Sequence, residues 1–394
     1  MRLPSPYDRL LIPIYIPSFL MAMSNQAMIL LLPLYALQVL DSPAYAALVV
    51  GFRGLGILLF DVPAGMLVGR FGDKAVLLGG LITHAAVMIV LTVASAEWLV
   101  PLLAIPLGGS MAAWFLGRQS FITESSPARE RGRAIAVMAG INRSGFLIGP
   151  LAGGFVANLY GYPVAFVAGA IFALVAAVIV LLATTNRRSK KAPKETVLAV
   201  IGRTLSSNRS FFATSGIVAL SIQLMRATQQ LLVPLFGTFV GLDVAAIGLI
   251  FSLCAALDMS LFYPVGIVMD RWGRKWTGVP SMLFFVLGLL LLPFAQGFYS
   301  LLGAGLVLAF ANGLSTGIVM IIGMDMAPPD QRAQFLGVWR LLGDLGTVTG
   351  PLLAGVLVNI ATLGAASFVV AAIGLVGAGT FAFVVPETRD LGID

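Results

Sequence analysis

The residues of this chain that could do chemistry are charged side chains standing inside long apolar stretches. A charge in hydrocarbon is costly unless it is paired or hydrated, so such residues are functional candidates by default. A carboxylate that loses an Arg partner in a low-dielectric cleft takes up a proton more readily, which makes the acidic members candidate proton carriers. The residues are Arg53, Asp61, Arg118, Arg143, Arg226, Asp258, Arg340 and Asp344.

The chain offers little for catalysis or for metal binding. Its one cysteine, Cys254, excludes a disulfide framework, and its one histidine, His84, leaves no Cys/His metal cluster. The segment GLGILL at 54 to 59 lacks the lysine and the preceding strand of a nucleotide-binding loop. We therefore expect no catalytic residues, no metal and no cofactor, with Cys254 in packing contacts and His84 as a buried polar residue.

The composition places these charges in a membrane. With 10 % charged residues, 59 % hydrophobic residues and a mean hydropathy of +0.99, most of the surface must face lipid. Six stretches without Lys or Arg are each at least 43 residues long, enough for two membrane helices and a short turn. They predict twelve spans. The stretches are 10 to 52, 75 to 117, 144 to 186, 227 to 270, 276 to 331 and 341 to 388.

The distribution of basic residues predicts the topology. Lys and Arg cluster between the hairpins, above all in the run 187 to 194, and by the positive-inside rule these loops and both termini face the cytoplasm. The net charge of +7 is therefore topological, and because the run has no interleaved aromatic residues we expect no nucleic-acid partner. The turns within the hairpins are expected at Asp41 and Pro43, Glu97, Gly161 and Pro163, Asp243, Gln296 and Gly297, and Gly364.

The two halves of the chain superpose at a constant offset of 201 residues. The segment LLLPLY at 30 to 35 faces LLVPLF at 231 to 236, and no gap is needed over more than 120 residues. The matches fall on Gly, Pro and Arg rather than on Leu and Val, which indicates duplication of a six-helix unit. Because each unit has an even number of spans, the units are related by an axis along the membrane normal, with a cleft between them.

Two motifs occur once in each half. GMLVGRFGDK at 65 to 74 and GIVMDRWGRK at 266 to 275 follow spans two and eight, while GFLIGPLAGG at 145 to 154 and GTVTGPLLAG at 346 to 355 lie in spans five and eleven. With PETRD at 386 to 390, these segments resemble the loop motif, the fifth-helix motif and the C-terminus of the major facilitator superfamily. The resemblance implies an all-α membrane fold of twelve transmembrane helices in two pseudo-symmetric six-helix bundles (the major facilitator fold), working by alternating access.

The loop motif is expected to form a cytoplasmic gate. Gly72 and Gly273 permit a tight turn, and basic neighbours hold it in the cytoplasm. Asp270 can accept hydrogen bonds from the N-terminal amides of a helix in the opposite half. The first copy departs from the family pattern, with Gly69 at the acidic position and Asp73 at a basic one. The gate residues are Gly65, Arg70, Gly72, Lys74, Gly266, Asp270, Arg271, Gly273, Arg274 and Lys275.

The glycine-proline motif sets small residues on one helix face, where another backbone can approach closely, and its proline can bend the helix. In the family this motif is associated with antiporters, which implies export by exchange, while a plain packing interface explains the same glycines. The residues are Gly145, Gly149, Pro150, Gly153, Gly154, Gly346, Gly350, Pro351 and Gly355.

Depth and the resemblance together predict two ion pairs between the halves. At 1.5 Å per residue, Asp61 and Arg340 lie about 12 to 13 Å from the nearest cytoplasmic loop, and Arg143 and Asp258 about 17 to 18 Å. In the family fold spans two and eleven face each other, as do spans five and eight. We expect these pairs to switch with the access state; the alternative is static pairs that fix helix packing. The proton-coupling or ion-pair candidates are Asp61, Asp258, Asp344, Arg53, Arg143 and Arg340, with Asp344 near Arg53.

Spans one and seven present polar groups to the cleft at matched depth, because Arg226 aligns with Asn25 in the repeat. Arg226 has no acidic residue in its own span, which suggests an anionic substrate group or a bound anion; Asp258 as its partner is the alternative. Arg118 can extend its charge towards the cytoplasm. The substrate-binding candidates are Asn25, Gln26, Gln223, Arg226, Gln229 and Gln230.

The sequence thus predicts a secondary active transporter with a six-helix bundle at 1–185, a basic cytoplasmic linker at 186–209 and a second bundle at 210–394. We expect a monomer that exports drug-like or amphipathic small molecules by proton coupling across the bacterial inner membrane, with both termini cytoplasmic. A carrier for an organic anion or an anionic lipid-like solute is the alternative. A lipid enzyme is disfavoured because no nucleophile with a base is present, and a sensor because no loop could hold a soluble domain.

Overall fold

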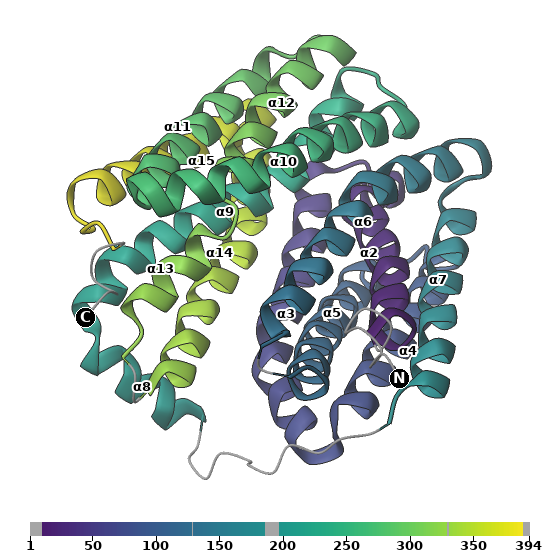
Figure 1. Cartoon of the computed structure of the whole chain (residues 1–394). Coiled ribbons are helices and arrows are strands. Elements are labelled where there is room, and N and C mark those ends of the chain that lie inside the picture. Colours follow the sequence, from purple (N-terminus) through teal and green to yellow (C-terminus); the bar gives the residue numbers. More distant parts are fainter. Residues whose placement is uncertain (1–9, 128, 186–196, 329–330, 389–394) are drawn as a thin grey trace. The chain divides into compact units, whose positions relative to one another are not determined.

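The computed structural model describes residues 10–127, 129–185, 197–328 and 331–388. This part of the chain contains helices and connecting turns, without a strand. Figure 1 shows the helices in chain order. Twelve helical segments are long and apolar enough to cross a membrane, which confirms the predicted number of spans.

The helices of the first half come first along the chain, and the second half begins with a short helix that precedes its membrane helices. The first half has η1 (Leu11–Tyr15), α2 (Ile16–Val39), α3 (Pro43–Phe71), α4 (Asp73–Leu91), α5 (Leu99–Ser125), α6 (Arg131–Tyr160) and α7 (Tyr162–Ala183). The second half has α8 (Val197–Ser207), α9 (Arg209–Phe239), α10 (Val244–Trp272), α11 (Lys275–Leu291), η2 (Leu292–Phe294), α12 (Phe298–Leu314), α13 (Ile318–Met326), α14 (Arg332–Ile360) and α15 (Leu363–Phe383).

The helices end where the sequence predicts turns. Gly72, Gly161 and Gly273 have φ angles of 91°, 84° and 104°, a region that glycine reaches without a clash of Cβ. Pro150 and Pro351 lie inside α6 and α14, which continue past them. The basic run at 187 to 194 lies outside the described residues, while the rest of the expected linker contains α8.

The chain divides into two compact units. The first consists of Met1–Asp41, Phe52–Pro193 and Asp243–Ser252, and the second of Ser42–Gly51, Lys194–Leu242 and Leu253–Asp394. Each unit therefore holds the helices of one sequence repeat, except that the first residues of α3 and of α10 are grouped with the other repeat.

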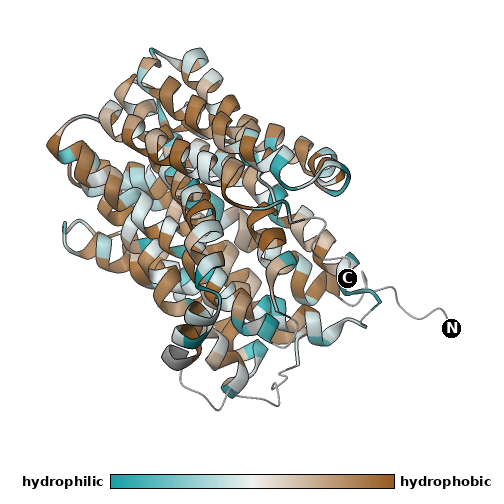
Figure 2. Cartoon of the chain, turned by 90° about the vertical axis from the view of Figure 1, so that its left-hand side faces the viewer, coloured by the Kyte–Doolittle hydropathy of each residue, from teal (hydrophilic) through white to brown (hydrophobic). Residues whose placement is uncertain are grey.

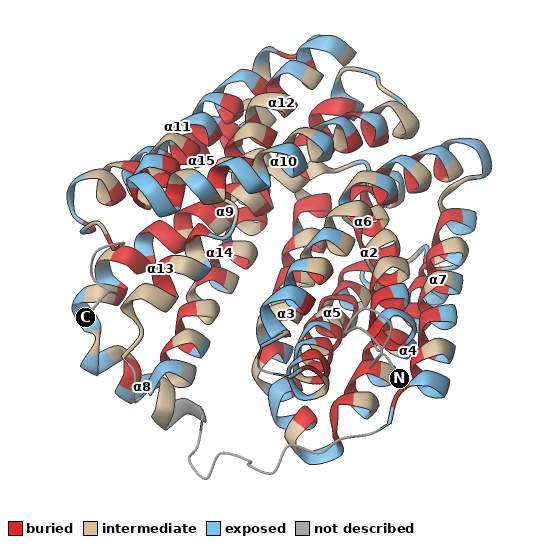
Figure 3. Ribbon diagram, viewed as in Figure 1, coloured by how far each residue is buried: buried red, intermediate tan, exposed pale blue. Residues whose placement is uncertain are grey.

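The surfaces of the helices are apolar, as expected where lipid is the solvent. Figure 2 shows brown, hydrophobic residues along most helices, and Figure 3 shows that many helices carry a buried side and an exposed side. Phe383 is 89 % exposed and Leu182 is 80 % exposed, values that would be costly in water. The twelve spans and these exposed apolar side chains indicate an integral, multi-pass membrane protein.

Candidate functional site

The tenth span, Phe298–Met326, is broken in its middle. Helix α12 ends at Leu314 and α13 begins at Ile318, and between them Gly317 takes a φ of 75° in the left-handed region. The sequence NGLSTG at 312 to 317 explains the break, because Ser, Thr and Asn side chains bond locally to the backbone and glycine reaches positive φ. The break leaves carbonyl groups at the end of α12 that need donors from outside the helix.

Arg226, on α9, supplies those donors. Its Nη2 donates to the Ser315 carbonyl at 3.0 Å, to Ser315 Oγ at 2.6 Å and to the Asn312 carbonyl at 3.5 Å. Its Nη1 donates to Gln223 Oε1 at 3.4 Å. A positive charge at the C-terminal end of a helix is stabilised by the helix dipole, so Arg226 acts as a cap for α12.

Asp258, on α10, lies at the same break. The Thr316 hydroxyl is 3.5 Å from Asp258 Oδ1 and 3.1 Å from the Asn312 carbonyl. The Asn312 amide also donates to Gln229 Oε1 at 2.9 Å. The second unit therefore brings together three predicted substrate-binding candidates, Gln223, Arg226 and Gln229, with the predicted proton carrier Asp258, around a break that the sequence analysis missed. We call these residues with Asn312, Ser315 and Thr316 the break cluster.

The composition of residues 312 to 317 indicates the break that was missed. Two glycines and three polar residues within six positions interrupt an otherwise apolar span, which is a turn signature at membrane depth. Comparison of the two repeats supports this interpretation, because the break occurs in one of them only. At the offset of 201, Asn312, Ser315, Thr316 and Gly317 stand opposite Met111, Trp114, Phe115 and Leu116 in α5, which runs unbroken from Leu99 to Ser125.

The first unit has a smaller polar group at the position equivalent to Arg226. Arg53 Nη2 on α3 donates to Asn25 Oδ1 on α2 at 2.7 Å. Asn25, Gln26 and Asp61 are buried, with exposures of 8 %, 4 % and 8 %. Gln230, in the second unit, is half-buried on α9. The substrate-binding candidates thus lie in both units, and those of the second unit carry the charge.

The predicted ion pairs join residues of different units and stay predictions. Within the second unit, Arg340 Nε lies 3.7 Å from Asp344 Oδ2, one turn along α14. Arg118 is buried and donates to Asn142 Oδ1 at 2.9 Å, between α5 and α6, instead of extending towards the helix end.

His84 belongs to a buried hydrogen-bonded group in the first unit. Its Nε2 lies 3.1 Å from Ser24 Oγ and its Nδ1 lies 3.3 Å from Ser110 Oγ, while Ser24 Oγ donates to the Gly169 carbonyl at 3.0 Å. These contacts join α2, α4, α5 and α7, and the predicted burial of His84 is confirmed. Cys254 is a free thiol, half-buried on α10.

The lysines of the two loop motifs make equivalent contacts in the two units. Lys74 Nζ donates to the Leu181 and Thr184 carbonyls at 2.7 Å each, at the end of α7. Lys275 Nζ donates to the Ala382 carbonyl at 2.9 Å, at the end of α15. Each lysine thus caps the last helix of its own unit.

The second loop motif also contacts Glu387, a residue of the PETRD segment. Glu387 accepts from the backbone amides of Arg274 and Lys275 at 2.8 and 3.0 Å, at the start of α11. Arg274 Nε lies 3.0 Å from Asp325 Oδ2 and its Nη1 lies 3.7 Å from Asp270 Oδ1. Asp270 is 79 % exposed, so its contact with an opposite-half helix stays a prediction.

The glycines of the fifth-helix motif lie at close helix contacts. Gly145, Gly149 and Gly153 on α6 face α2, while Gly346 and Gly350 on α14 face α9. A Cβ at Gly149 would stand 2.7 Å from the Met23 carbonyl, and one at Gly350 would stand 2.6 Å from the Leu224 carbonyl. The next glycine of each copy meets a helix start: Gly154 faces Val244, and Gly355 faces Ala47.

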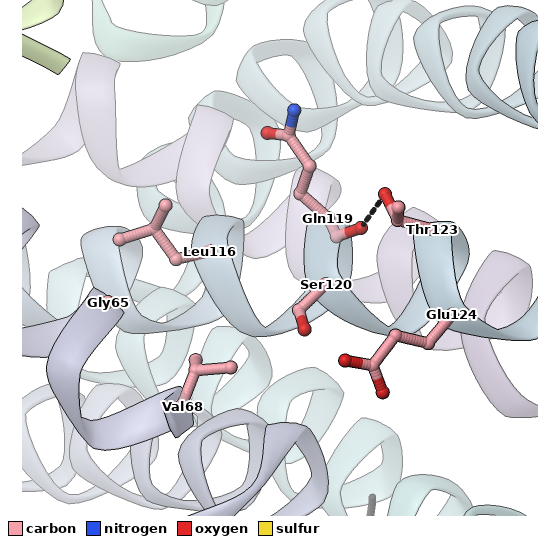
Figure 4. A pocket seen from close by; sticks show the side chains of 7 residues that line it. All are labelled: Gly65, Val68, Leu116, Gln119, Ser120, Thr123 and Glu124. Carbon is pink, nitrogen blue, oxygen red and sulfur yellow. Dashed lines mark hydrogen bonds between the residues drawn. The ribbon is translucent and has the colours of Figure 1, made fainter. Parts of the chain in front are cut away.

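A cavity of about 300 Å³ lies between α3 and α5 in the first unit. Figure 4 shows its lining, in which apolar and polar side chains mix. The Thr123 hydroxyl donates to the Gln119 carbonyl at 2.8 Å. The lining residues are Gly65, Val68, Leu116, Gln119, Ser120, Thr123 and Glu124. Gly65 is the one gate residue in this lining.

Two six-helix repeats with polar clusters inside apolar spans define a membrane transporter rather than an enzyme. The chain belongs to the major facilitator superfamily: the sequence model of that family matches residues 14–257 and again residues 216–392.

Relatives and solved structures agree with this assignment. The multidrug resistance protein MdtH of Aeromonas hydrophila subsp. hydrophila is 26 % identical over 362 residues, 84 % of either chain. MdtH of Aeromonas salmonicida is 25 % identical over 349 residues, 81 % of either chain. The nucleoside transporter NupG has a TM-score of 0.78 at 15 % identity, covering 96 % of this chain and 99 % of that one. A peptide transporter POT also has a TM-score of 0.78, at 13 % identity, covering 99 % and 96 %. At these identities the solved structures show the fold alone.

Proposed function

We propose that this protein exports drug-like or amphipathic small molecules in exchange for protons, by alternating access, as a monomer of the bacterial inner membrane with both termini in the cytoplasm. The observation that carries the proposal is the break cluster, in which a carboxylate and a guanidinium lie at one interruption of a membrane helix. Ionisable residues in spans are retained for function because burying them is costly. The relatives named multidrug resistance proteins support the choice of substrate class.

The chemistry of the break cluster suits amphipathic solutes. The side chains of Gln223 and Gln229 accept hydrogen bonds and those of Asn312 and Thr316 donate them, and each of these amide and hydroxyl groups can do both. A few polar groups among apolar walls are typical of sites for small molecules. Asp258 supplies a group that can change its charge during the cycle, and Asp61 and Asp344 are further proton-carrier candidates.

An organic anion carrier is the second candidate, because Arg226 is a cation at membrane depth. The contacts of Arg226 favour the first proposal. Its Nη2 donates to the end of α12 and to Ser315, so the helix end already provides the negative partner that an anionic solute would otherwise supply. The anion-carrier hypothesis therefore requires Arg226 to leave these contacts when an anion binds.

Alternating access requires contacts that form in one state and break in the other. We propose Asp61 with Arg340 and Arg143 with Asp258 as such contacts, and the two loop motifs as the cytoplasmic gate. Exchanging the charges of one pair, as in Asp61→Arg with Arg340→Asp, should restore transport that each single change abolishes. Single variants that transport normally would remove the pair from the proposal.

The test of the function is transport in proteoliposomes with an imposed pH gradient, using ethidium as the amphipathic probe and a fluorescent sulfonate as the anionic one. We expect the gradient to drive ethidium transport by the wild type, and Asp258→Asn to lose this dependence. An ionophore that collapses the gradient is the control. Ethidium transport that ignores the gradient would contradict proton coupling, and sulfonate transport abolished by Arg226→Ala would favour the anion carrier.

A further inference from the structure

We propose that the Thr316 hydroxyl relays the protonation state of Asp258 to Arg226, through the carbonyl group of Asn312. The inference rests on the proposed proton coupling and deepens it, because it assigns the residue that connects the proton carrier to the substrate-binding side of the break cluster. Thr316 is thus a positioning residue that acts through its neighbours.

The geometry gives one hydroxyl proton two acceptors. Thr316 Oγ1 lies 3.5 Å from Asp258 Oδ1 on α10 and 3.1 Å from the Asn312 carbonyl on α12. A hydroxyl group has one proton to donate and can also accept, so it can satisfy these two groups in turn. The Asn312 carbonyl in turn accepts from Arg226 Nη2 at 3.5 Å, which completes a continuous path from Asp258 to Arg226.

The charge of Asp258 decides which acceptor the hydroxyl serves. When Asp258 is ionised, the bond to its carboxylate is charge-assisted and outcompetes the neutral carbonyl. When Asp258 takes a proton from solvent, its own O–H donates to Thr316 Oγ1, and the hydroxyl proton turns to the Asn312 carbonyl. The Thr316 proton stays on its oxygen throughout, so the relay reorients bonds and transfers no proton along the path.

The change in the direction of the Thr316 hydroxyl affects both the start of α13 and the end of α12. In the ionised state Thr316 is held to α10, which fixes the start of α13, where Ile318 N donates to the Ser315 carbonyl at 3.3 Å. In the protonated state this hold weakens, while the Asn312 carbonyl gains a donor that competes with Arg226. Arg226 thereby loses the longest of its Nη2 contacts at the end of α12, while its bonds to the Ser315 carbonyl and hydroxyl remain.

Other ionisable side chains also lie on the helices of this unit. On helices α9 to α15, the ionisable side chains of the described residues besides Arg226 and Asp258 are Arg209 on α9, Cys254 and Tyr263 on α10, Tyr299 on α12, Asp325 on α13, and Arg332, Arg340 and Asp344 on α14, with Asp270, Arg271, Arg274 and Lys275 at the junction of α10 and α11. Asp325 is engaged by Arg274 and Asp344 by Arg340. Arg226 bonds to Ser315, the residue before Thr316.

The repeat gives an independent argument. Opposite Asp258, Thr316 and Asn312 the first half has Ile57, Phe115 and Met111, and opposite Arg226 it has Asn25. Helix packing of the same overall fold therefore does not require these polar residues. Their appearance together, in one half and in one contact path, points to a role in the transport cycle.

The test is hydrogen–deuterium exchange of the backbone between residues 312 and 322, with the full-length protein in liposomes and no added ligand. After correction for intrinsic rates, we expect these amides in the wild type to exchange about fivefold faster near pH 5 than near pH 8, the lower end of usual coupling strengths. Thr316→Val should exchange fast at both pH values, and so should Asp258→Asn. Thr316→Ser, which keeps the hydroxyl, should behave as the wild type.

The matched control is Thr380→Val, which removes a hydroxyl that bonds to its own helix at the Val376 carbonyl in the same unit. It should leave the pH response unchanged. A pH response that survives in Thr316→Val overturns the relay, as does a wild type without a response. Failure of the proposed function is recognised separately, because it would appear as ethidium transport by the wild type that ignores the imposed pH gradient. If Thr316→Val does not fold, Thr316→Ala provides the same comparison.

Discussion

Spans four and ten occupy equivalent positions in the two sequence repeats, but they differ in continuity. Helix α5 runs from Leu99 to Ser125 without interruption, whereas span ten is divided into α12 and α13. The residues that interrupt span ten contact the charged residues of the neighbouring helices, and their counterparts in span four are apolar. One half thus has a continuous helix at this position and the other has a polar break.

Other features of the repeat are the same in both halves. The glycines on α6 and α14 make the same kind of close contact with α2 and α9, and the loop lysines cap α7 and α15 alike. Features that support helix packing and turns are shared, and features with ionisable chemistry at membrane depth differ. Substitutions at shared positions should therefore have matched effects in both halves, and those at the break cluster should not.

The largest effect is expected for Arg226→Met. It leaves the carbonyl groups at the end of α12 without their charged donor in a low-dielectric setting, which should cost about 3 kcal/mol of unfolding free energy. Asn25→Leu at the equivalent position removes an acceptor of Arg53 and should cost about 1 kcal/mol. Thermal unfolding in detergent measures both. Equal losses would show that the two positions contribute equally to stability and would contradict the expected asymmetry of the halves.

A slightly smaller loss is expected for Gly346→Val. A Cβ there would stand 2.5 Å from the Leu220 carbonyl, so α14 and α9 must separate, which should cost about 2 to 3 kcal/mol. Gly145→Val should do the same between α6 and α2. Gly337→Val is the control, because nothing lies within 4 Å of a Cβ at that position. If Gly337→Val lost as much unfolding free energy as Gly346→Val, the loss would come from the low helix propensity of valine and not from the close contact between α14 and α9.

The sequence predicted the shared features well because their causes are local or periodic. Span length and the placement of Lys and Arg follow from lipid thickness and topology, and the glycines at positive φ follow from backbone sterics. The break in span ten was missed because counting charges within apolar stretches does not detect a neutral polar turn. The contacts of Arg226 with Ser315 and Asn312 join positions almost ninety residues apart, and no local pattern specifies such a pair.

A moderate effect is expected for Gly317→Ala, which tests the break itself. An alanine at a φ of 75° costs about 1 to 2 kcal/mol, so the variant should favour a straighter span ten. Leu116→Ala at the equivalent position of α5 removes side-chain contacts without changing the helix. Hydrogen–deuterium exchange across residues 312 to 322 should slow in Gly317→Ala and stay unchanged in Leu116→Ala. Faster exchange in Gly317→Ala would mean that the break is held by the surrounding helices rather than by glycine.

The smallest and most symmetric effect is expected for the loop lysines. Lys74→Met removes the donor to the Leu181 and Thr184 carbonyls, and Lys275→Met removes the donor to the Ala382 carbonyl. A cation at a helix C-terminus contributes about 0.3 to 1 kcal/mol, so each variant should lower the unfolding temperature by a small and similar amount. Added salt should reduce the difference from the wild type, since exposed charges are screened. A much larger loss in Lys275→Met would show that the Glu387 contacts at the start of α11 depend on this lysine, and that the loop motifs, too, have diverged between the halves.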